Sequence, residues 1–486
     1  MSESSNVRGG EMTREVMQVK MLIGGQWRAG RTEFEDVDPY RNEIVARVSE
    51  STIEDLNDAL DAAVAAKPAI AAMPAYERAA LLRRVGHLLV ERADQIAEIM
   101  ARETGKAIKD AKTEVLRSQD TIALSAEEAV RIEGEHVPLD SAPMGAGKLA
   151  MLLRFPVGVV AAITPFNAPF NLACHKVAPA IAAGNAVVLK PPSAAPAVVH
   201  ALVELFVDAG TPPGVLNVIY GRAMGPALVR DPRVDFITFT GSGRTGADIK
   251  AASGLRRVAL ELGNNGPTIV HADANLDEAT PLCARNAMRL AGQSCVSVQN
   301  LYVHVSRYDH FLERLVTAVR LLKMGDPLDP QTDVGTLIDE AAAERVEQWV
   351  EEARSQGAVA LTGAKRTGAQ YEPTTLVNVQ PTMRVVCDEI FGPVASVRAY
   401  TDLEAVFAEI SRSRYGLQCG IFTQSVAIAL QAARTLRTGG IIINGTSTWR
   451  TDQLAYGGIK DSGIGREGPR YAIREMTEER LIVFNQ

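Results

Sequence analysis

The chain has 486 residues, more than one hydrophobic core usually supports, so two or three domains are expected. Its apolar content of 47% and charged content of 22% are those of a globular protein rather than a disordered one. A formal net charge of -7 with scattered Lys and Arg argues against a nucleic-acid partner. The polar first twenty residues are expected to form a loose tail, and no apolar run reaches the length of a membrane span.

The cysteines give no sign of a metal or redox motif. There are five, an odd number, and none pairs with another or with histidine at metal-ligand spacing: Cys174, Cys283, Cys295, Cys387 and Cys419. We therefore expect reduced thiols in a cytoplasmic protein without a bound metal.

The first 132 residues are expected to be mainly helical. From Tyr76 to Leu89, leucine and valine recur at three- and four-residue spacing, which predicts an amphipathic helix. A second helix is expected after Gly105, running towards Ile132. The segment 133–150 then contains the Pro- and Gly-bearing stretch VPLDSAPMGAGK and marks a boundary.

The segment 151–264 alternates short apolar runs with helical stretches. The strand candidates are VGVVAAI, AVVLK, VLNVI, FITF and RVALEL. Strands that alternate with helices indicate an α/β fold with a doubly wound parallel sheet, in which ligands bind at the carboxyl ends of the strands. The same alternation of apolar runs and helical stretches continues in 265–450, so a second doubly wound domain is expected there. Its strand candidates are YEPTTLVNV, ASVRAY, CGIFT and GGIIIN.

The stretch FTGSGRTG contains a G-x-G-x-x-G at Gly241, Gly243 and Gly246, and Glu261 lies twenty residues beyond the first of these glycines. This spacing matches a dinucleotide-binding fingerprint, in which the acid would bind a ribose hydroxyl. The pattern alone does not decide whether Glu261 binds a cofactor or does chemistry.

Three further residues are candidates for chemistry. Cys295 lies among small and polar residues in RLAGQSCVSVQN, although a lone cysteine is more often a buried structural residue. Glu261 ends a predicted strand in VALELGNNGP, where a carboxylate would project into the ligand crevice. Asn167 follows VGVVAAI in ITPFNAPFN, where forming a turn beside two prolines is an equal alternative.

The ordered set ITPFNAPFN, GNAVVLKPPS, FITFTGSGRTG, LELGNNGP, GQSCVSVQ, EIFGPV and YGGIKDSGIGREG resembles the NAD(P)-dependent aldehyde dehydrogenase superfamily from about Met21 to Phe484. The resemblance implies a cofactor domain, a catalytic domain and a small β oligomerisation element. That element is expected to combine 133–150 with the C-terminal strand of the return segment 451–486. A homodimer or homotetramer is implied.

The resemblance also implies a mechanism. Cys295 would attack the aldehyde, and the Asn167 amide with the Cys295 backbone N–H would hold the oxyanion. Glu261 would be the general base that activates water, not a ribose ligand. Lys176 matches a lysine near the proton pathway and Glu467 a relay acid, although a solvated or salt-bridged charge is an equal alternative for both.

For the cofactor, NADP or NAD, the resemblance implies binding by a set of residues along the cofactor domain, completed by two in EIFGPV: Thr164, Pro165, Phe166, Lys190, Pro191, Ser193, Gly225, Phe239, Thr240, Gly241, Ser242, Thr245, Leu262, Gly263, Glu389 and Phe391. Many NAD-preferring relatives have an acid where this chain has Ser193, so NADP is expected to be accepted. Asn264 is a second departure, because glycine is common there.

The substrate is expected to be a small hydroxylated or anionic aldehyde. The segment that begins at Ser447, STWRTDQLAYGGIKDSGIGREG, resembles the branch of lactaldehyde, phosphonoacetaldehyde and non-phosphorylating glyceraldehyde-phosphate dehydrogenases. In that branch Arg450 would face the substrate tail and Lys112 would assist. Ser294 stands where relatives that bind phosphorylated substrates often carry arginine.

Three other functions stay open. A CoA-acylating dehydrogenase would lack the water-activating Glu261, and a cofactor-binding protein without turnover would have lost Cys295, Glu261 or Asn167. A thiol hydrolase would need a histidine base, but none of the seven histidines lies near Cys295 in sequence.

Overall fold

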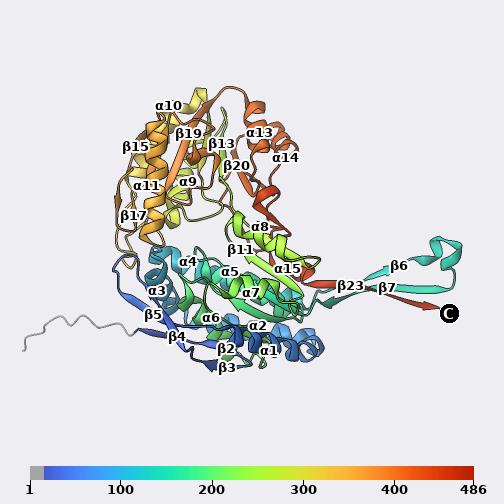
Figure 1. The fold of residues 1–486 in the computed structure, drawn as a ribbon. Coiled ribbons are helices and arrows are strands. Elements are labelled where there is room, and N and C mark those ends of the chain that lie inside the picture. Colours follow the sequence, from blue (N-terminus) through green and yellow to red (C-terminus); the bar gives the residue numbers. More distant parts are fainter. Residues whose placement is uncertain (1–15, 486) are drawn as a thin grey trace, which may run out of the picture.

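The computed structural model describes residues 16–485, which form two α/β bodies and a projecting β arm (Figure 1). An eight-stranded sheet organises the first body and a seven-stranded sheet the second. Both predicted α/β domains are therefore present. Among the described residues, no helix is both long enough and apolar enough to cross a membrane.

The centre of the first sheet has the expected doubly wound order. Its parallel strands run β12-β11-β8-β9-β10. Strand order reverses between β8 and β11, so their carboxyl ends open a crevice for a ligand. The strands are β8 (Val159–Ile163), β9 (Ala186–Lys190), β10 (Leu216–Val218), β11 (Phe236–Thr240) and β12 (Arg257–Glu261), with helices α5 (Pro169–Ala182), α6 (Pro196–Asp208), α7 (Met224–Arg230) and α8 (Gly243–Ala252).

The N-terminal part contains the two predicted helices, α2 (Ala75–Glu91) and α4 (Ile108–Ala129), together with α1 (Ile53–Ala72) and α3 (Ala93–Thr104). The expectation of a mainly helical segment missed five strands: β1 (Met17–Val19), β2 (Met21–Ile23), β3 (Gln26–Arg28), β4 (Thr32–Val37) and β5 (Ile44–Glu50). Strands β2 and β3 extend the eight-stranded sheet beyond β10. Strand β1 pairs with β5, so the end of the expected loose tail is ordered, and the rest of that tail lies outside the described residues.

The second sheet has the order β15-β18-β19-β14-β13-β20-β21. The sequence indicated β18 (Thr374–Val377), β19 (Val394–Tyr400), β20 (Gln418–Phe422) and β21 (Gly440–Ile443), but not β13 (Pro267–Val270), β14 (Asn300–His304) or the antiparallel edge strand β15 (Val359–Thr362). Its helices are α9 (Leu276–Met288), α10 (Tyr308–Arg320), α11 (Glu340–Ser355), α12 (Arg384–Cys387), α13 (Leu403–Arg412) and α14 (Val426–Thr435), and β16 (Arg366–Thr367) pairs with β17 (Gln370–Tyr371) in a separate ribbon.

The β arm consists of β6 (Glu135–Val137), β7 (Lys148–Pro156) and β23 (Thr477–Asn485), in the order β23-β7-β6. Strand β23 pairs antiparallel with β7 of its own chain along its whole length, and β7 runs past the expected boundary at 150. Figure 1 shows this arm extending away from both bodies. The far edge of β23 stays open, and Leu481, Val483 and Phe484 are exposed.

The return segment brings the C-terminal part back to the cofactor sheet. Strand β22 (Gly463–Ile464) pairs antiparallel with β12, placing Gly463 opposite Glu261. Helix α15 (Pro469–Glu475) follows and packs on α4 and α5. As a result, the residues around Glu467 lie next to the end of β12, although the two segments are far apart in the sequence.

Candidate active site

Cys295 follows α9 on a segment with unusual backbone geometry. Leu290 and Ala291 have φ of 57° and 50°, and Gly292 has φ of 70°. The left-handed region costs a non-glycine residue roughly 1–2 kcal/mol. A Cβ on Gly292 would lie 1.9 Å from the Gly392 carbonyl oxygen, so glycine is required there. Surrounding packing therefore holds this turn in place and directs the cysteine that follows it.

The thiol of Cys295 lines a cavity and is otherwise surrounded by protein. Its Sγ lies 3.4 Å from the hydroxyl of Tyr456. Burial raises the pKa of the thiol to about 12, and the nearby carboxylates of Glu389 and Glu261 act in the same direction. The sulfur is therefore a protonated thiol at neutral pH.

Asn167 lies two residues before α5 and reaches the segment that carries Cys295. Its side-chain amide donates to the Gln293 carbonyl oxygen at 3.0 Å. The Lys106 ammonium donates to the backbone carbonyl of Asn167 at 2.9 Å and is paired with Glu114. Glu114 also accepts from the backbone N–H of Phe170. These contacts fix the loop, so the sequence-predicted amide lies beside the sequence-predicted thiol.

Glu261 ends β12 as a buried carboxyl group, and its Oε2 has no hydrogen-bond partner in the described structure. Burial raises its pKa well above the usual value, and repulsion from Glu467 adds to this effect. Lys176 donates to Glu467 at 3.1 Å and to Thr238 at 3.2 Å. Lys176 and Glu467 therefore form a buried ion pair rather than two solvated charges, and both act on the charge of Glu261.

Arg450 lines the cavity that contains Cys295, but its guanidinium is already engaged. It donates to the second oxygen of Glu467 at 3.0 Å and lies 3.2 Å from His175 Nε2. Although burial disfavours a charge here, Lys176 and Arg450 hold the pKa of Glu467 at about 2. Glu467 is thus ionised between two cations.

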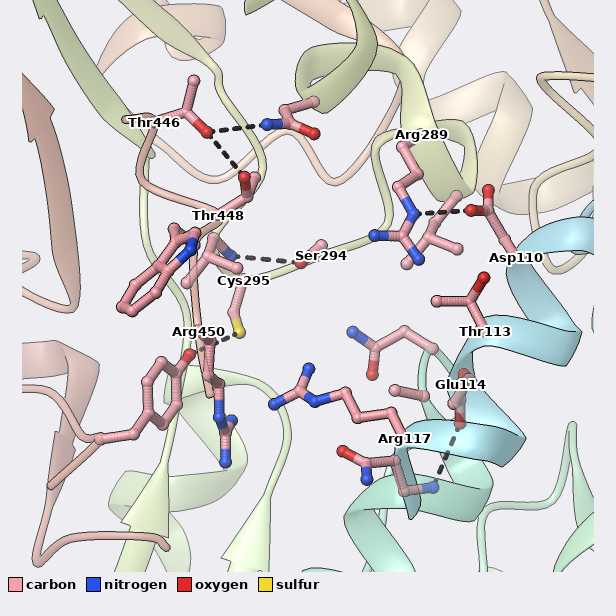
Figure 2. A pocket seen from close by; sticks show the side chains of 18 of the residues that line it. Asp110, Thr113, Glu114, Arg117, Arg289, Ser294, Cys295, Thr446, Thr448 and Arg450 are labelled. Carbon is pink, nitrogen blue, oxygen red and sulfur yellow. Dashed lines mark hydrogen bonds and ion pairs between the residues drawn. The ribbon is translucent and has the colours of Figure 1, made fainter. Parts of the chain in front are cut away.

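The cavity in front of Cys295 has a volume of about 440 Å³ and is lined by Asn167, Ser294 and Arg450 among the expected residues. Sequence reasoning missed two arginines that also line it, Arg117 and Arg289. Figure 2 shows both side chains extending towards the space around Cys295. Helical spacing on α4 from Asp110 through Glu114 to Arg117 was the available signal, because these positions share one face.

Lys112 does not lie in this cavity, which corrects the expectation that it assists with the substrate. Its side chain is half exposed and forms an ion pair with Asp94 at 2.8 Å. Thr113, one residue further along α4, does line the cavity. A step of one residue turns a side chain by about 100° around the helix axis, which directs Lys112 away from the site.

A second cavity, of about 890 Å³, opens at the carboxyl ends of β8 and β11. Its lining includes most of the expected cofactor residues: Thr164, Pro165, Phe166, Lys190, Gly225, Phe239, Thr240, Gly241, Ser242 and Thr245. The N-terminus of α8 begins there, and Ser242 caps it by accepting from the Thr245 N–H. Free backbone N–H groups at a helix start suit a pyrophosphate, so these residues fit a dinucleotide.

The G-x-G-x-x-G stretch has a divided role. Gly241 lines the dinucleotide cavity, whereas a Cβ on Gly246 would lie 2.5 Å from the side chain of Leu262. Gly246 therefore allows α8 to pack against the chain after β12. Glu261 lines neither the dinucleotide cavity nor the cavity in front of Cys295.

The remaining expected cofactor residues surround Glu389. Leu262 and Glu389 line an adjoining cleft that shares Ser242 with the dinucleotide cavity. Burial raises the pKa of Glu389 to about 7, and its carboxylate accepts from the Asn264 N–H at 3.1 Å. A Cβ on Gly263 would lie 2.3 Å from Glu389.

Asn264 is not among the residues with positive φ, so asparagine replaces the more common glycine there without backbone strain.

Phe391 lies edge-on to Phe166, with the ring centroids 6.0 Å apart. Four of the expected cofactor residues line neither the dinucleotide cavity nor the adjoining cleft: Pro191, Ser193, Gly263 and Phe391. The Oγ of Ser193 is nevertheless buried without a hydrogen-bond partner in the described part of the chain, and Arg222 is an unexpected cation in the dinucleotide cavity.

The sequence model of the Aldehyde dehydrogenase family matches residues 27–482. The chain belongs to this family. This match confirms the resemblance found in the sequence. The protein is therefore an oxidoreductase that acts on aldehydes with NAD or NADP.

Among similar proteins, "3-sulfolactaldehyde dehydrogenase" of Priestia megaterium is 45% identical, over 97% of this chain and 99% of the relative. "Lactaldehyde dehydrogenase" of Methanocaldococcus jannaschii is 36% identical, over 96% and 100%. The crystal structure of an NADP-dependent glyceraldehyde-3-phosphate dehydrogenase from Bacillus halodurans, complexed with NADP, has a TM-score of 0.93 and 34% identity, with coverage of 96% and 99%. The expected fold class is confirmed.

The raised pKa of Cys295 predicts slow alkylation of this residue at neutral pH. Because only the thiolate reacts, the rate with iodoacetamide in the protein without cofactor should rise about tenfold for each pH unit from pH 7 to pH 9. Mass spectrometry of the peptides measures this rate, and the exposed Cys387 serves as an internal control. A plateau for Cys295 below pH 8 would contradict the effect of burial.

Proposed function

We propose that this aldehyde dehydrogenase oxidises a small aldehyde with an anionic tail to its carboxylic acid, with Cys295 as nucleophile, Asn167 as oxyanion donor and Glu261 as general base. The observation that carries the proposal is the shared cavity, which places the Cys295 thiol in front of Arg117 and Arg289. The catalytic roles follow from the chemistry of each group.

The first bond forms between the aldehyde carbon and Cys295 Sγ, which attacks as the thiolate after the thiol proton has passed to water. The carbonyl oxygen becomes an oxyanion, which the Asn167 amide and the Cys295 backbone N–H stabilise by donating hydrogen bonds. The Asn167 amide donates in this structure to the Gln293 carbonyl, only two positions before the nucleophile. The amide is therefore a hydrogen-bond donor close to Cys295 in the chain fold, and it would exchange this carbonyl for the substrate oxygen.

The second stage releases the acid. The bound cofactor supplies the acceptor for the hydride that leaves the substrate carbon, and a thioester remains on Cys295. Glu261 removes a proton from water as the water oxygen attacks the thioester carbon, which breaks the carbon–sulfur bond. Because its pKa is raised, the carboxyl group of Glu261 must first ionise; its Oε2, which has no hydrogen-bond partner among the described residues, is then the acceptor that this step needs. This base distinguishes the reaction from a CoA-acylating one.

Replacing the base should separate the two stages. We expect Glu261→Gln to keep a rapid burst of NAD(P)H, close to one per active site, because thioester formation does not need the base. Steady-state turnover should fall by about 100-fold or more, within the range of general-base catalysis. Stopped-flow absorbance at 340 nm measures both phases.

Cys295→Ala is the matched control, since it should abolish burst and turnover together. Loss of the burst in Glu261→Gln would contradict the division of roles. Release of the thioester by CoA at the wild-type steady-state rate would favour the acylating reaction.

The two cavity arginines support an anionic tail. Arg117 is held by Asp452 at 2.5 Å and Arg289 by Asp110 at 2.7 Å, so both guanidinium groups are preorganised. Arg289 is bonded through Nε, and Figure 2 shows its other nitrogens directed into the cavity. Paired N–H donors suit a sulfonate, carboxylate or phosphate. The relative named for sulfolactaldehyde supports the same chemistry.

A neutral hydroxylated aldehyde is the second candidate. The hydroxyl groups of Thr113, Ser294 and Thr448 also line the cavity, and one relative is named for lactaldehyde. Hydroxyl groups can bind a substrate hydroxyl but do not compensate a charge. Under this alternative the arginines would serve only their ion pairs with Asp452 and Asp110.

Substitution of the arginines distinguishes these candidates. Arg289→Leu and Arg117→Leu should each raise KM for an anionic aldehyde such as succinate semialdehyde by about 10- to 100-fold, because a charge-assisted pair is lost. KM for propanal should change by less than about threefold. Initial rates at 340 nm provide both values.

Lys112→Leu is the matched control on the same helix, since its side chain points away from the cavity and pairs with Asp94. Arg289→Leu combined with Asp110→Asn removes both members of the ion pair and tests whether an unpaired Asp110 causes the effect. Equal changes for charged and neutral aldehydes would contradict an anionic tail.

The dinucleotide cavity supports use of NADP as well as NAD. Ser193 brings no negative charge where a 2′-phosphate would be repelled, and Arg222 adds a positive charge close to Lys190. Burial and the neighbouring Arg222 lower the pKa of Lys190 to about 8. A phosphate between the two cations would relieve their repulsion.

We propose that the protein works in the cytoplasm as a homodimer or homotetramer. All five cysteines are free, which suits a reducing compartment. The β arm leaves one edge of β23 open and exposes Leu481, Val483 and Phe484, and an open apolar edge favours pairing with another chain.

The double variant Leu481→Asp/Val483→Asp should lower the molar mass measured by light scattering to that of a smaller assembly. Charged side chains on an edge strand oppose pairing between chains. Val426→Asp, on a different exposed surface, is the control. A wild-type protein that is monomeric would contradict the proposal.

A further inference from the structure

Tyr456 has no part in the mechanism above, yet its hydroxyl lies 3.4 Å from Cys295 Sγ and its side chain is almost fully buried. We propose that Tyr456 is a further catalytic residue, whose phenol donates a hydrogen bond to the Cys295 thiolate and whose ring is held in place by Arg450. The inference rests on the proposed role of Cys295 as the nucleophile. It concerns how that nucleophile is generated in a buried site.

The position of the phenol is fixed from two sides. The Arg450 guanidinium carbon lies 3.7 Å from the centroid of the Tyr456 ring, which places the cation over the ring face. The Tyr456 carbonyl oxygen accepts from the Glu467 N–H at 2.6 Å. Arg450 itself is bonded to Glu467 and contacts His175. The hydroxyl therefore reaches Cys295 from a ring that has little freedom to move.

The chemical need for such a donor follows from the burial of the sulfur. Burial raises the pKa of the thiol to about 12, and the facing carboxylates of Glu389 and Glu261 disfavour the thiolate further. Tyr456 and Arg450 are the neighbouring groups that favour the charged form. A hydroxyl can accept from the neutral thiol and, once the thiol proton has passed to water or hydroxide, rotate its own hydrogen to donate to the sulfur.

A hydrogen bond to the thiolate has two opposing effects. It increases the fraction of thiolate, and it lowers the intrinsic nucleophilicity of the sulfur. On a logarithmic scale of rate, the loss of nucleophilicity cancels only about half of the gain from the larger thiolate fraction. In a site where the thiolate is scarce, the net result is faster attack. Arg450 holds the ring in place, and its positive charge also favours the thiolate directly.

Alkylation of Cys295 in the protein without cofactor tests the proposal apart from turnover. Tyr456→Phe keeps the ring and removes only the hydroxyl. Loss of a hydrogen bond to a charged group should raise the thiol pKa by about one unit, and the more nucleophilic sulfur should offset about half of the effect on rate. The iodoacetamide rate should therefore fall by about threefold at pH 8, which is an upward displacement of the rate profile by about half a pH unit. Arg450→Gln should produce a smaller shift in the same direction.

Tyr471→Phe on α15 removes a hydroxyl outside the site and should leave the alkylation profile unchanged. Unchanged alkylation in Tyr456→Phe, with a thermal midpoint equal to wild type, would overturn the role of the phenol. Aldehyde oxidation that persists in Cys295→Ala would instead overturn the proposed function, so the two failures are distinguishable.

Discussion

The buried carboxylate of Glu467 lies between Lys176 and Arg450, and the arrangement of the active site depends on this charged contact. It connects α5, the loop that carries Arg450 and the return segment after β22. Removal of one partner of a buried ion pair lowers the free energy of unfolding by about 3–5 kcal/mol, because the other charge is then left uncompensated. The three segments are thus held in one arrangement around Glu261, whose own charge is disfavoured there.

This arrangement separates two electrostatic tasks. On one side, Glu467, Lys176 and Arg450 act on the charge of Glu261, the proposed general base, whose Oε2 has no hydrogen-bond partner among the described residues. On the other side, the cavity presents Arg117 and Arg289, each held by its own carboxylate. Cys295, the proposed nucleophile, lines the same cavity as these two arginines. In the proposed mechanism, charge for catalysis and charge for substrate recognition therefore come from different residues, although Arg450 both lines the cavity and pairs with Glu467.

The sequence predicted the central strands because they are continuous apolar runs. It indicated Cys295 and Glu261 as candidate catalytic residues through the family's motifs. It missed β2 and β3, which are too short for a periodic signal, and its placement of Lys112 was wrong by one helical position. Helical spacing alone could place Arg117 on one face of α4 but not next to Cys295, and no local pattern indicated Tyr456, because both reach the site through the packing of distant segments.

The substrate preference of the wild-type enzyme tests the proposed role of the cavity arginines most directly. Reduction of NAD and NADP at 340 nm would be followed with sulfolactaldehyde, succinate semialdehyde, lactaldehyde and propanal, each with and without CoA. We expect CoA-independent turnover and a kcat/KM for the anionic aldehydes about tenfold or more above that for the neutral ones of similar size, because a charge-assisted pair forms only with the former. Equal or higher kcat/KM for lactaldehyde and propanal would contradict recognition of an anionic tail.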